Sequence, residues 1–117
     1  MPKNAARLYI VLHGMPGKKG LLKPSDSAFY WRYKDFIVQF QAWWGDHSSP
    51  DEKQYLHWIE SSRKALEPHL QGAFVNFVDK DIPVEEYYGG NFTRLKEIKK
   101  KWDPNNVFHF PLSIPLQ

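Results

Sequence analysis

The alternation of apolar and polar side chains predicts four extended segments in this chain. Residues 8–12 form a short apolar run rich in β-branched side chains, and residues 27–32 are a second candidate. Apolar residues recur at every second position in residues 35–44 and again in residues 73–79. A period of two sends alternate side chains to opposite faces of a sheet. The pattern therefore predicts a sheet of about four strands.

Two glutamines interrupt the third of these segments. Gln39 and Gln41 are two positions apart, so they share one face of an otherwise apolar strand. A neutral amide is costly to bury without hydrogen-bond partners. The residues alone leave two interpretations open. Either the amides hydrogen-bond within the core or to an adjacent chain, or they line a ligand site.

Two amphipathic segments predict helices. The first begins at a capping box over residues 49–52 and ends near residue 66, ahead of Pro68. The second covers residues 92–102 and ends where Asp103 and Pro104 follow. Residues 80–88 are expected to form a loop, and residues 107–117 an extended tail. This order indicates an α+β fold, with an antiparallel sheet and two main helices packed on one face.

Length and composition restrict the function classes. The chain has 117 residues, which suits a single domain over residues 1–117 and is too short for a cofactor domain plus a substrate domain. It has no cysteine, which excludes disulfides and thiolate metal sites. The apolar run at residues 8–12 is too short for a signal-peptide core or a membrane span, so we expect no membrane and favour a cytoplasmic location.

The charge distribution and the positions of the histidines indicate neither a nucleic-acid-binding surface nor a metal site. The net charge is +3, and much of the excess comes from four lysines between residues 96 and 101. A solvated helix face explains this run better than nucleic-acid binding, which would need a broader basic surface. The five histidines show no metal-ligand spacing, so no metal site is expected. Asp79 and Asp81, two positions apart at a predicted strand end, suit loop capping better than acid–base work.

Five blocks of the chain carry a family resemblance. Residues 73–81 are similar to an Ala–aromatic–x–Asn–Tyr–x–Asp–x–Asp strand, and residues 88–95 to a Tyr–Gly–x–Asn–x–x–Arg–Leu helix entry. Residues 98–108 are similar to a Val–Lys–x–x–Tyr–Asp–Pro–x–Asn–x–Phe run, and residues 113–115 to the end of a Gln–Ser–Ile–Pro terminus. Upstream, residues 28–32 and 38–44 look like substrate-domain strands. In this order and spacing, the blocks resemble the C-terminal, berberine-like substrate domain of the berberine bridge enzyme-like FAD-linked oxidases.

The resemblance implies an oxidoreductase. Enzymes of that family transfer a hydride from an alcohol, sugar or alkaloid-like substrate to FAD, and their substrate domain roofs the flavin with an antiparallel sheet. Gln39 and Gln41 fall where the family places polar residues that contact the substrate.

Four further residues match motif positions that lie near the flavin or the domain interface: Asn76, Asn91, Asn105 and Phe108. The residues themselves offer plainer roles for three of them. Asn91 is a helix N-cap, Asn105 a turn residue and Phe108 a core residue.

One position departs from the family pattern. Phe77 stands where many members carry a tyrosine base, and a phenylalanine has no ionisable proton to exchange. The resemblance therefore implies a residue beside the substrate that is not a base, and it leaves no catalytic residue assigned in this chain. The plainer interpretation is that Phe77 packs against the sheet. Leu112 likewise replaces the usual glutamine of the terminal motif.

The family's FAD-binding domain has no counterpart in these residues. The resemblance therefore implies FAD in the complete enzyme, none in this chain alone, and an FAD-binding domain or chain as partner. We expect the chain to be non-catalytic by itself. The alternative is a stand-alone binding or assembly module that reuses the fold. An apolar sheet face would then be exposed and would favour a homodimer.

Overall fold

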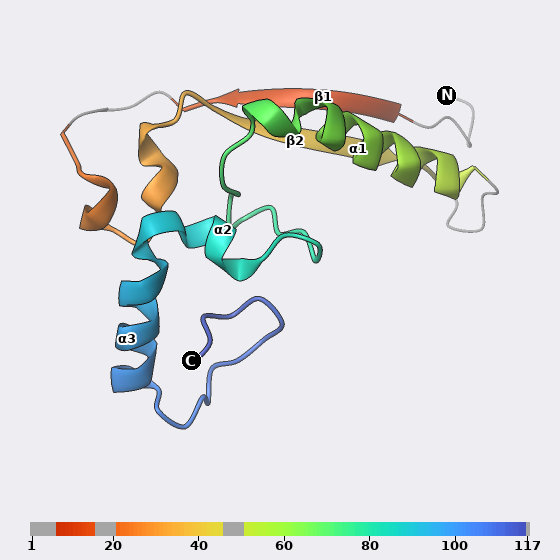
Figure 1. Ribbon diagram of the computed structural model, residues 1–117. Helices are drawn as coiled ribbons and strands as arrows, with labels where there is room; N and C mark the ends of the chain where they lie inside the picture. The colour runs from red at the N-terminus through yellow and green to blue at the C-terminus, as the bar shows by residue number, and fades with distance from the viewer. Residues whose placement is uncertain (1–6, 16–20, 46–50, 117) are drawn as a thin grey trace. The chain divides into compact units, whose positions relative to one another are not determined.

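A computed structural model describes residues 7–15, 21–45 and 51–116 (Figure 1). The chain divides into two units, each built from two separate segments. Unit 1 is Met1–Gly14 with Phe36–Leu70, and unit 2 is Met15–Asp35 with Gln71–Gln117. Within the described ranges, no helix is both long and apolar enough to cross a bilayer.

Unit 1 is a β-hairpin-like pair of strands with a helix against it. Strand β1 (Arg7–Gly14) pairs antiparallel with β2 (Phe36–Trp43), in a register that sets Val11 opposite Gln39. Helix α1 (Glu52–Leu66) contacts β2. The ring of Trp44, directly after β2, lies 5.6 Å from that of Tyr55 in α1. The first and third predicted strands are thus confirmed, each with bounds shifted by one or two residues.

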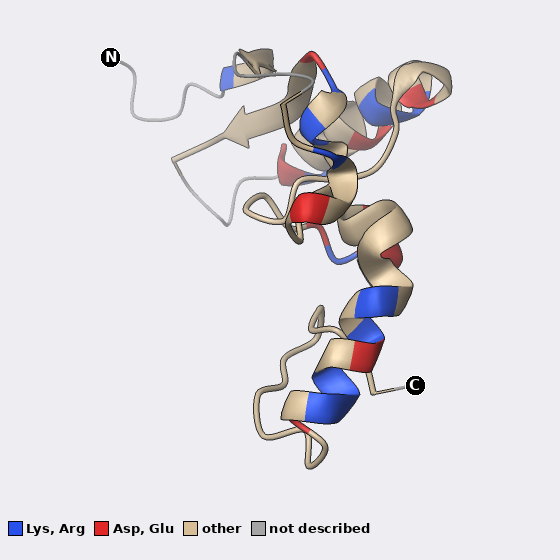
Figure 2. Ribbon diagram, turned by 90° about the vertical axis from the view of Figure 1, so that its left-hand side faces the viewer, with Lys and Arg blue, Asp and Glu red and all other residues tan. Residues whose placement is uncertain are grey.

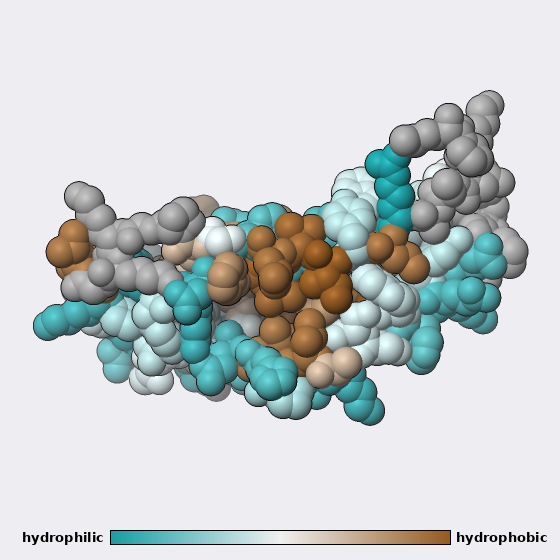
Figure 3. Space-filling view, turned by 90° about the horizontal axis from the view of Figure 1, so that it is seen from above, coloured by the Kyte–Doolittle hydropathy of each residue, from teal (hydrophilic) through white to brown (hydrophobic). Residues whose placement is uncertain are grey.

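The pairing of β1 and β2 gives the sheet two chemically different faces. Residues directly opposite each other in an antiparallel pair point the same way. We call one side the glutamine face; its positions are Arg7, Tyr9, Val11, His13, Ile37, Gln39, Gln41 and Trp43. The other is the apolar face; its positions are Leu8, Ile10, Leu12, Gly14, Phe36, Val38, Phe40 and Ala42. Several apolar-face side chains on β1 are exposed, and Figure 3 shows apolar side chains gathered near the middle of the view.

Helix α1 follows its prediction at the C-terminal end. It ends at Leu66, and a single 3-10 turn over Glu67–His69 accommodates Pro68, which cannot continue an α-helix. Arg63 and Lys64 lie in its last turn, where cations interact favourably with the helix dipole. The N-cap is Asp51, without a side-chain capping bond. The predicted capping residue at position 49 lies outside the described residues.

Unit 2 is helical. It contains the short 3-10 turns η1 (Pro24–Asp26) and η2 (Tyr30–Tyr33), followed by α2 (Val84–Tyr88), η4 (Gly89–Asn91) and α3 (Phe92–Trp102). The bounds of α3 agree with the prediction. Helix α2 was not predicted, because five residues are too few to show a helical period, although Pro83 suits a position directly ahead of a helix.

The prediction of a strand over residues 27–32 is wrong. The aromatic side chains there pack among themselves, with the rings of Tyr30 and Trp31 5.0 Å apart in a T-shaped arrangement, and the backbone winds into η2. Glycines allow this packing. A Cβ atom on Gly72 would lie 2.0 Å from the Trp31 ring, and one on Gly89 would lie 2.5 Å from Tyr30. Both glycines have positive φ, at 68° and 48°.

The prediction of a strand over residues 73–79 is wrong as well. The segment turns, with the Phe77 N–H donating to the Phe74 carbonyl at 2.9 Å. The Ala73 N–H donates instead to Glu86 in α2, at 3.0 Å. A strand needs a neighbouring extended backbone, whereas this segment meets a helix. The apolar alternation reflects an aromatic cluster, in which Phe74 lies 5.6 Å from Phe29. The described residues therefore form a two-stranded sheet, and the α+β class is confirmed without the four strands.

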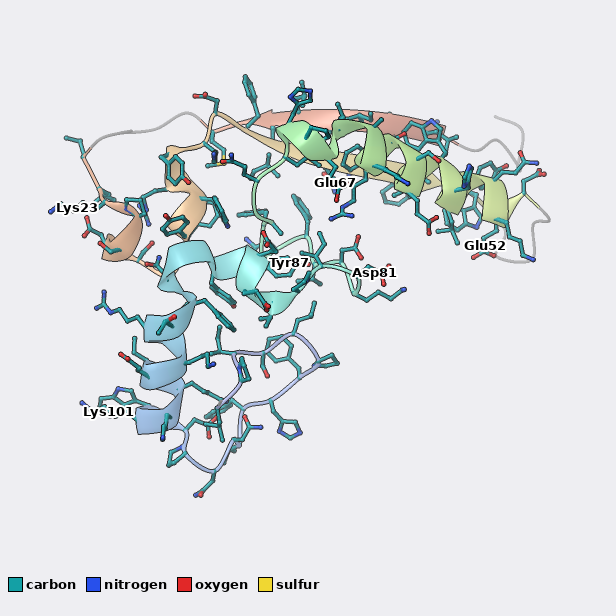
Figure 4. The ribbon with its side chains drawn as sticks, in the orientation of Figure 1. Lys23, Glu52, Glu67, Asp81, Tyr87 and Lys101 are labelled. Atoms are coloured by element: carbon teal, nitrogen blue, oxygen red, sulfur yellow. The ribbon has the colours of Figure 1, made fainter. Side chains whose placement is uncertain are left out.

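The buried centre of unit 2 is a tyrosine. Tyr87 in α2 is 2% exposed. Its hydroxyl accepts the Asp79 N–H at 2.7 Å and donates to the Asp79 carbonyl at 3.0 Å, so it holds the loop that carries Asp81 beside α2 (Figure 4). The Asp79 carboxylate accepts the Asp81 N–H at 2.9 Å. The predicted loop-capping role of this aspartate is confirmed.

The basic run lies along α3, as Figure 2 shows in blue. Lys100 and Lys101 are exposed, and the Lys101 ammonium lies 5.3 Å from the centre of the Trp102 ring. Lys99 is different, because it is largely buried and pairs with Asp103.

Asp103 fastens the C-terminal tail to the end of α3. Its carboxylate accepts the backbone N–H groups of Val107 at 2.7 Å and Phe108 at 3.1 Å, and it also accepts a hydrogen bond from Lys99. The Lys99 ammonium in turn donates to the Phe108 carbonyl. The Lys99 hydrogen bond, with the two backbone bonds behind it, holds the pKa of Asp103 below its usual value.

The Asp103 contacts predict an acid-sensitive fold. Because the pKa is lower in the folded chain than in the unfolded one, the carboxylate stabilises the fold above the unfolded value and loses this effect as the pH falls below about 4. Thermal unfolding followed by circular dichroism should show the melting temperature falling across that range. Asp103→Asn should lower the melting temperature at pH 7, by on the order of 5 °C, and flatten the acid dependence.

Asp81→Asn is the matched control, since Asp81 is exposed and pairs only with exposed Lys80. It should leave the melting curve nearly unchanged. If Asp103→Asn kept both the melting temperature and the acid dependence of the original chain, the Asp103 hydrogen bonds would not stabilise the fold.

Candidate functional site

The glutamine face of unit 1 brings together the polar side chains that the sequence marked. Gln39 and Gln41 are both half-buried on β2. Their being on one face, predicted from spacing, is confirmed by the strand that contains them.

His13 of β1 contacts the first glutamine. The Nε2 atom of its ring lies 2.8 Å from Oε1 of Gln39, in a half-buried hydrogen bond across the two strands. His13 pairs with Ile37, two positions from Gln39, so the contact is the diagonal one that long side chains make in an antiparallel sheet. Sequence reasoning did not single out this contact, because His13 matched no metal or catalytic spacing. His13 lies an even number of positions from Tyr9 and Val11 on β1, and this spacing places it on the glutamine face.

Two aromatic residues lie beside Gln41. Trp43 is 61% exposed, and its indole N–H reaches Oε1 of Gln41 at 3.3 Å. Tyr9, opposite Gln41, is 39% exposed. Amide groups next to accessible ring faces can bind a ligand that has hydroxyl oxygens and an apolar side.

Asn91 is 7% exposed, and it ties unit 2 together. Its side-chain N–H₂ group donates to the Pro24 carbonyl at 2.8 Å and the Ser27 carbonyl at 2.9 Å, with a longer contact to Ala28 at 3.5 Å. Asn91 does occupy the N-cap position of α3, but its side chain makes no capping bond. The plainer role expected of it, helix capping, is therefore replaced by a tie to the loop at residues 24–28.

Asn76 and Phe77 lie in the turn that follows Phe74, and both are exposed. The Phe77 side chain is 47% exposed, and its ring lies 5.5 Å from that of Phe74. The expectation that Phe77 packs against a sheet is wrong, since the segment is not in one. The Phe77 ring thus contacts the aromatic cluster through Phe74 and is about half exposed.

Asn105 and Phe108 follow α3, and both are exposed, Phe108 at 79%. The core role considered for Phe108 is therefore wrong. Asn105 lies in the turn, as expected. The asparagine of the Asp–Pro–x–Asn motif corresponds by count to Asn106, which the sequence reasoning passed over. Asn106 has a left-handed φ of 52°, a conformation that asparagine tolerates better than most residues.

The four candidate cofactor residues do not form one cradle. Asn91 and Asn105 lie at opposite ends of α3, which has 11 residues and is therefore about 16 Å long. The amide donors of Asn91 are used by backbone carbonyls. Within residues 7–15, 21–45 and 51–116, no three histidine or carboxylate side chains are grouped as a metal site would require.

Tyr88, in the Tyr–Gly–Gly–Asn block, is a further residue that sequence reasoning did not single out. Its partial burial raises the pKa of the hydroxyl above the ordinary value for tyrosine. The phenol therefore stays protonated at neutral pH.

Comparison with known proteins agrees with the motif blocks. A family model described as "Berberine and berberine like" matches residues 73–115. The FAD-linked oxidoreductase YvdP of Bacillus subtilis is 44% identical over 92 residues, which cover 77% of this chain and 20% of that protein. The chain belongs to the berberine bridge enzyme-like family of FAD-linked oxidoreductases.

Two other family members extend the match. The FAD-linked oxidoreductase YgaK of Bacillus subtilis is 40% identical over 102 residues, covering 85% of this chain and 22% of that protein. The solved structure of Physcomitrella patens BBE-like 1 superposes with a TM-score of 0.67 at 30% identity, over 85% of this chain and 21% of that one. The chain thus spans about a fifth of the length of the berberine bridge enzyme-like proteins it matches.

The Asn91 contacts predict a large loss of stability on truncation. Asn91→Ala would remove a buried side chain and its half-buried hydrogen bonds to the Pro24 and Ser27 carbonyls, and should lower the free energy of unfolding by about 1–3 kcal/mol. Urea denaturation followed by tryptophan fluorescence measures this.

Asn105→Ala is the control for the same residue type at an exposed turn, and it should change stability by less than about 0.5 kcal/mol. Equal effects of the two substitutions would show that the loop tie contributes nothing.

Proposed function

We propose that this chain is the substrate-binding part of an FAD-dependent oxidoreductase that takes a hydride from an alcohol, sugar or alkaloid-like substrate. The observation that carries the proposal is the glutamine face, where Gln39 and Gln41 share one side of β2 and two accessible aromatic residues, Tyr9 and Trp43, lie beside Gln41. Family membership supports the reaction class, because the matched relatives are FAD-linked oxidoreductases.

In this proposal, Gln39 and Gln41 hold the substrate by hydrogen bonds to its oxygen atoms. Tyr9 and Trp43 contact the apolar side of the ligand and exclude water from it. Phe77 offers an accessible apolar ring that contacts the substrate without exchanging a proton. The proton of the oxidised hydroxyl is therefore accepted by a group outside residue 77.

FAD is held mainly by a partner FAD-binding domain, since the candidate cofactor residues of this chain are separated along α3 or engaged in the fold. Asn76, Asn105 and Phe108 are exposed, and they contribute contacts to the flavin or to that domain. Asn91 acts on the flavin side only indirectly, by holding the loop at residues 24–28. When bound, FAD supplies the hydride acceptor.

The test has two parts. The chain expressed alone should purify without the visible absorbance of a flavin and should oxidise no substrate. A chimera, in which this chain replaces the matching part of YvdP, should retain FAD. Under anaerobic conditions its flavin should be reduced by a member of a panel of alcohols and sugars.

In that chimera, Gln39→Ala and Gln41→Ala should each raise KM several-fold, with kcat little changed, because a contact kept from ground state to transition state affects binding alone. His57→Gln on α1, which is exposed, should change neither constant. A stoichiometric flavin in the isolated chain, or a chimera whose flavin no substrate reduces, would count against the proposal.

A second candidate function is a stand-alone homodimeric binding or assembly module. The exposed apolar face of β1 favours it, because Leu8, Ile10 and Leu12 are all accessible. Light scattering on the isolated chain separates the two. For the substrate-binding part of an oxidoreductase, we expect a monomer or only weak association, which Leu12→Lys abolishes. For the module, we expect a dimer that stays intact at micromolar concentration and that Leu12→Lys dissociates.

A further inference from the structure

We propose that His13 is a positioning residue, which fixes the side-chain amide of Gln39 so that its N–H₂ group faces the ligand. The inference rests on the proposed function, in that Gln39 is taken to contact the substrate. It adds an assignment that neither the motif blocks nor the family membership provides.

The hydrogen bond decides the orientation of the amide. Oε1 of Gln39 can only accept, so the Nε2 atom of His13, 2.8 Å away, must carry the hydrogen. Both the neutral Nε2–H tautomer and the imidazolium satisfy this requirement. An amide is planar, and its oxygen and nitrogen point to different sides of the terminal carbon. With Oε1 held by His13, the Nε2 group of Gln39 is directed away from the histidine.

The neighbouring glutamine is oriented in the same sense. Oε1 of Gln41 accepts the Trp43 indole N–H at 3.3 Å. Each amide of the glutamine face therefore has its oxygen engaged in one hydrogen bond from within the chain, which turns its N–H₂ group away from that partner. These N–H donors suit ligand atoms that accept hydrogen bonds, such as hydroxyl, ether or carbonyl oxygens.

The position of His13 makes the arrangement robust. The two residues lie on adjacent strands in fixed register, with His13 opposite Ile37 and Gln39 opposite Val11. The contact is half-buried, so water competes with it less than at an exposed site. A rotation of the Gln39 amide by half a turn would require the other neutral tautomer of His13, with the hydrogen on Nδ1, so the protonation of Nε2 reports the orientation of the amide.

The orientation is measured by NMR on the full chain labelled with ¹⁵N. A long-range ¹H–¹⁵N spectrum at neutral pH reports which ring nitrogen of His13 carries the hydrogen, and we expect Nε2. The side-chain N–H₂ resonances of Gln39 should move in His13→Leu, which removes the donor, and return toward their original positions in His13→Gln, whose Nε2 donor has a similar reach.

His57→Leu is the control, because His57 is an exposed histidine on α1 that hydrogen-bonds Ser61 rather than a glutamine. It should leave the Gln39 resonances in place. The assignment would be overturned, whatever the function of the chain, if Nε2 of His13 carried no hydrogen. It would also be overturned if the Gln39 side-chain resonances did not shift in His13→Leu.

A kinetic measurement connects the orientation to binding. In the flavin-loaded chimera with cellobiose as the probe, His13→Leu should raise KM about three- to ten-fold with kcat unchanged, and His13→Gln should restore most of the loss. Gln39→Ala should raise KM at least as much. His13→Leu combined with Gln39→Ala should be no worse than Gln39→Ala alone.

The kinetic results of Gln39→Ala and His13→Leu distinguish the substrate contact from the positioning role. If Gln39→Ala leaves KM unchanged, Gln39 does not bind the substrate and the proposed function of this face is wrong. If Gln39→Ala raises KM but His13→Leu does not, the substrate contact stands and the positioning role of His13 is overturned.

Discussion

The antiparallel pairing of β1 with β2 is the constraint on which the candidate site depends. Register fixes which side chains share a face, and a slip of one residue would exchange the glutamine face for the apolar one. The pairing sets Val11 opposite Gln39 and Tyr9 opposite Gln41, so one surface holds two amides, a histidine and aromatic rings. The strong apolar alternation on the other surface keeps that register in place, because a slip would move its side chains to the glutamine face.

Unit 2 is held together differently, by polar side chains that satisfy backbone groups. Asn91 donates hydrogen bonds to carbonyls in residues 24–28, and Tyr87 hydrogen-bonds both the N–H and the carbonyl of Asp79. Asp103 accepts hydrogen bonds from the N–H groups that follow α3. Irregular segments leave such groups without partners, and burying them unpaired is costly. Many residues of the family motifs are thus explained by architecture. The residues that remain exposed, such as Phe108, are the ones available to a partner.

The two amides of the glutamine face contribute hydrogen bonds rather than proton transfer, because amides do not titrate. In unit 2, Phe77 has no proton to give. The protonated phenol of Tyr88 is also unsuited to act as a base at neutral pH, because burial raises its pKa. In the proposed function, this face contributes orientation, because small displacements of the reacting carbon change the rate strongly. Fixing the amides from within the chain, as the His13 and Trp43 contacts do, lowers the entropic cost of holding a ligand.

The sequence by itself determined the helices at residues 52–66 and 92–102, the two paired strands and the shared face of Gln39 and Gln41, because these follow from local periodicity and from Pro68 and Pro104. It also determined the family, through the order of its motif blocks. Only the tertiary structure decided the conformation of residues 27–32 and 73–79. Their alternation is the same as that of a strand, but no extended backbone lies beside them, and aromatic packing against glycines bends them into turns. The partners of His13, Asn91 and Asp103 were likewise hidden, since hydrogen bonds between residues far apart in sequence leave no local pattern.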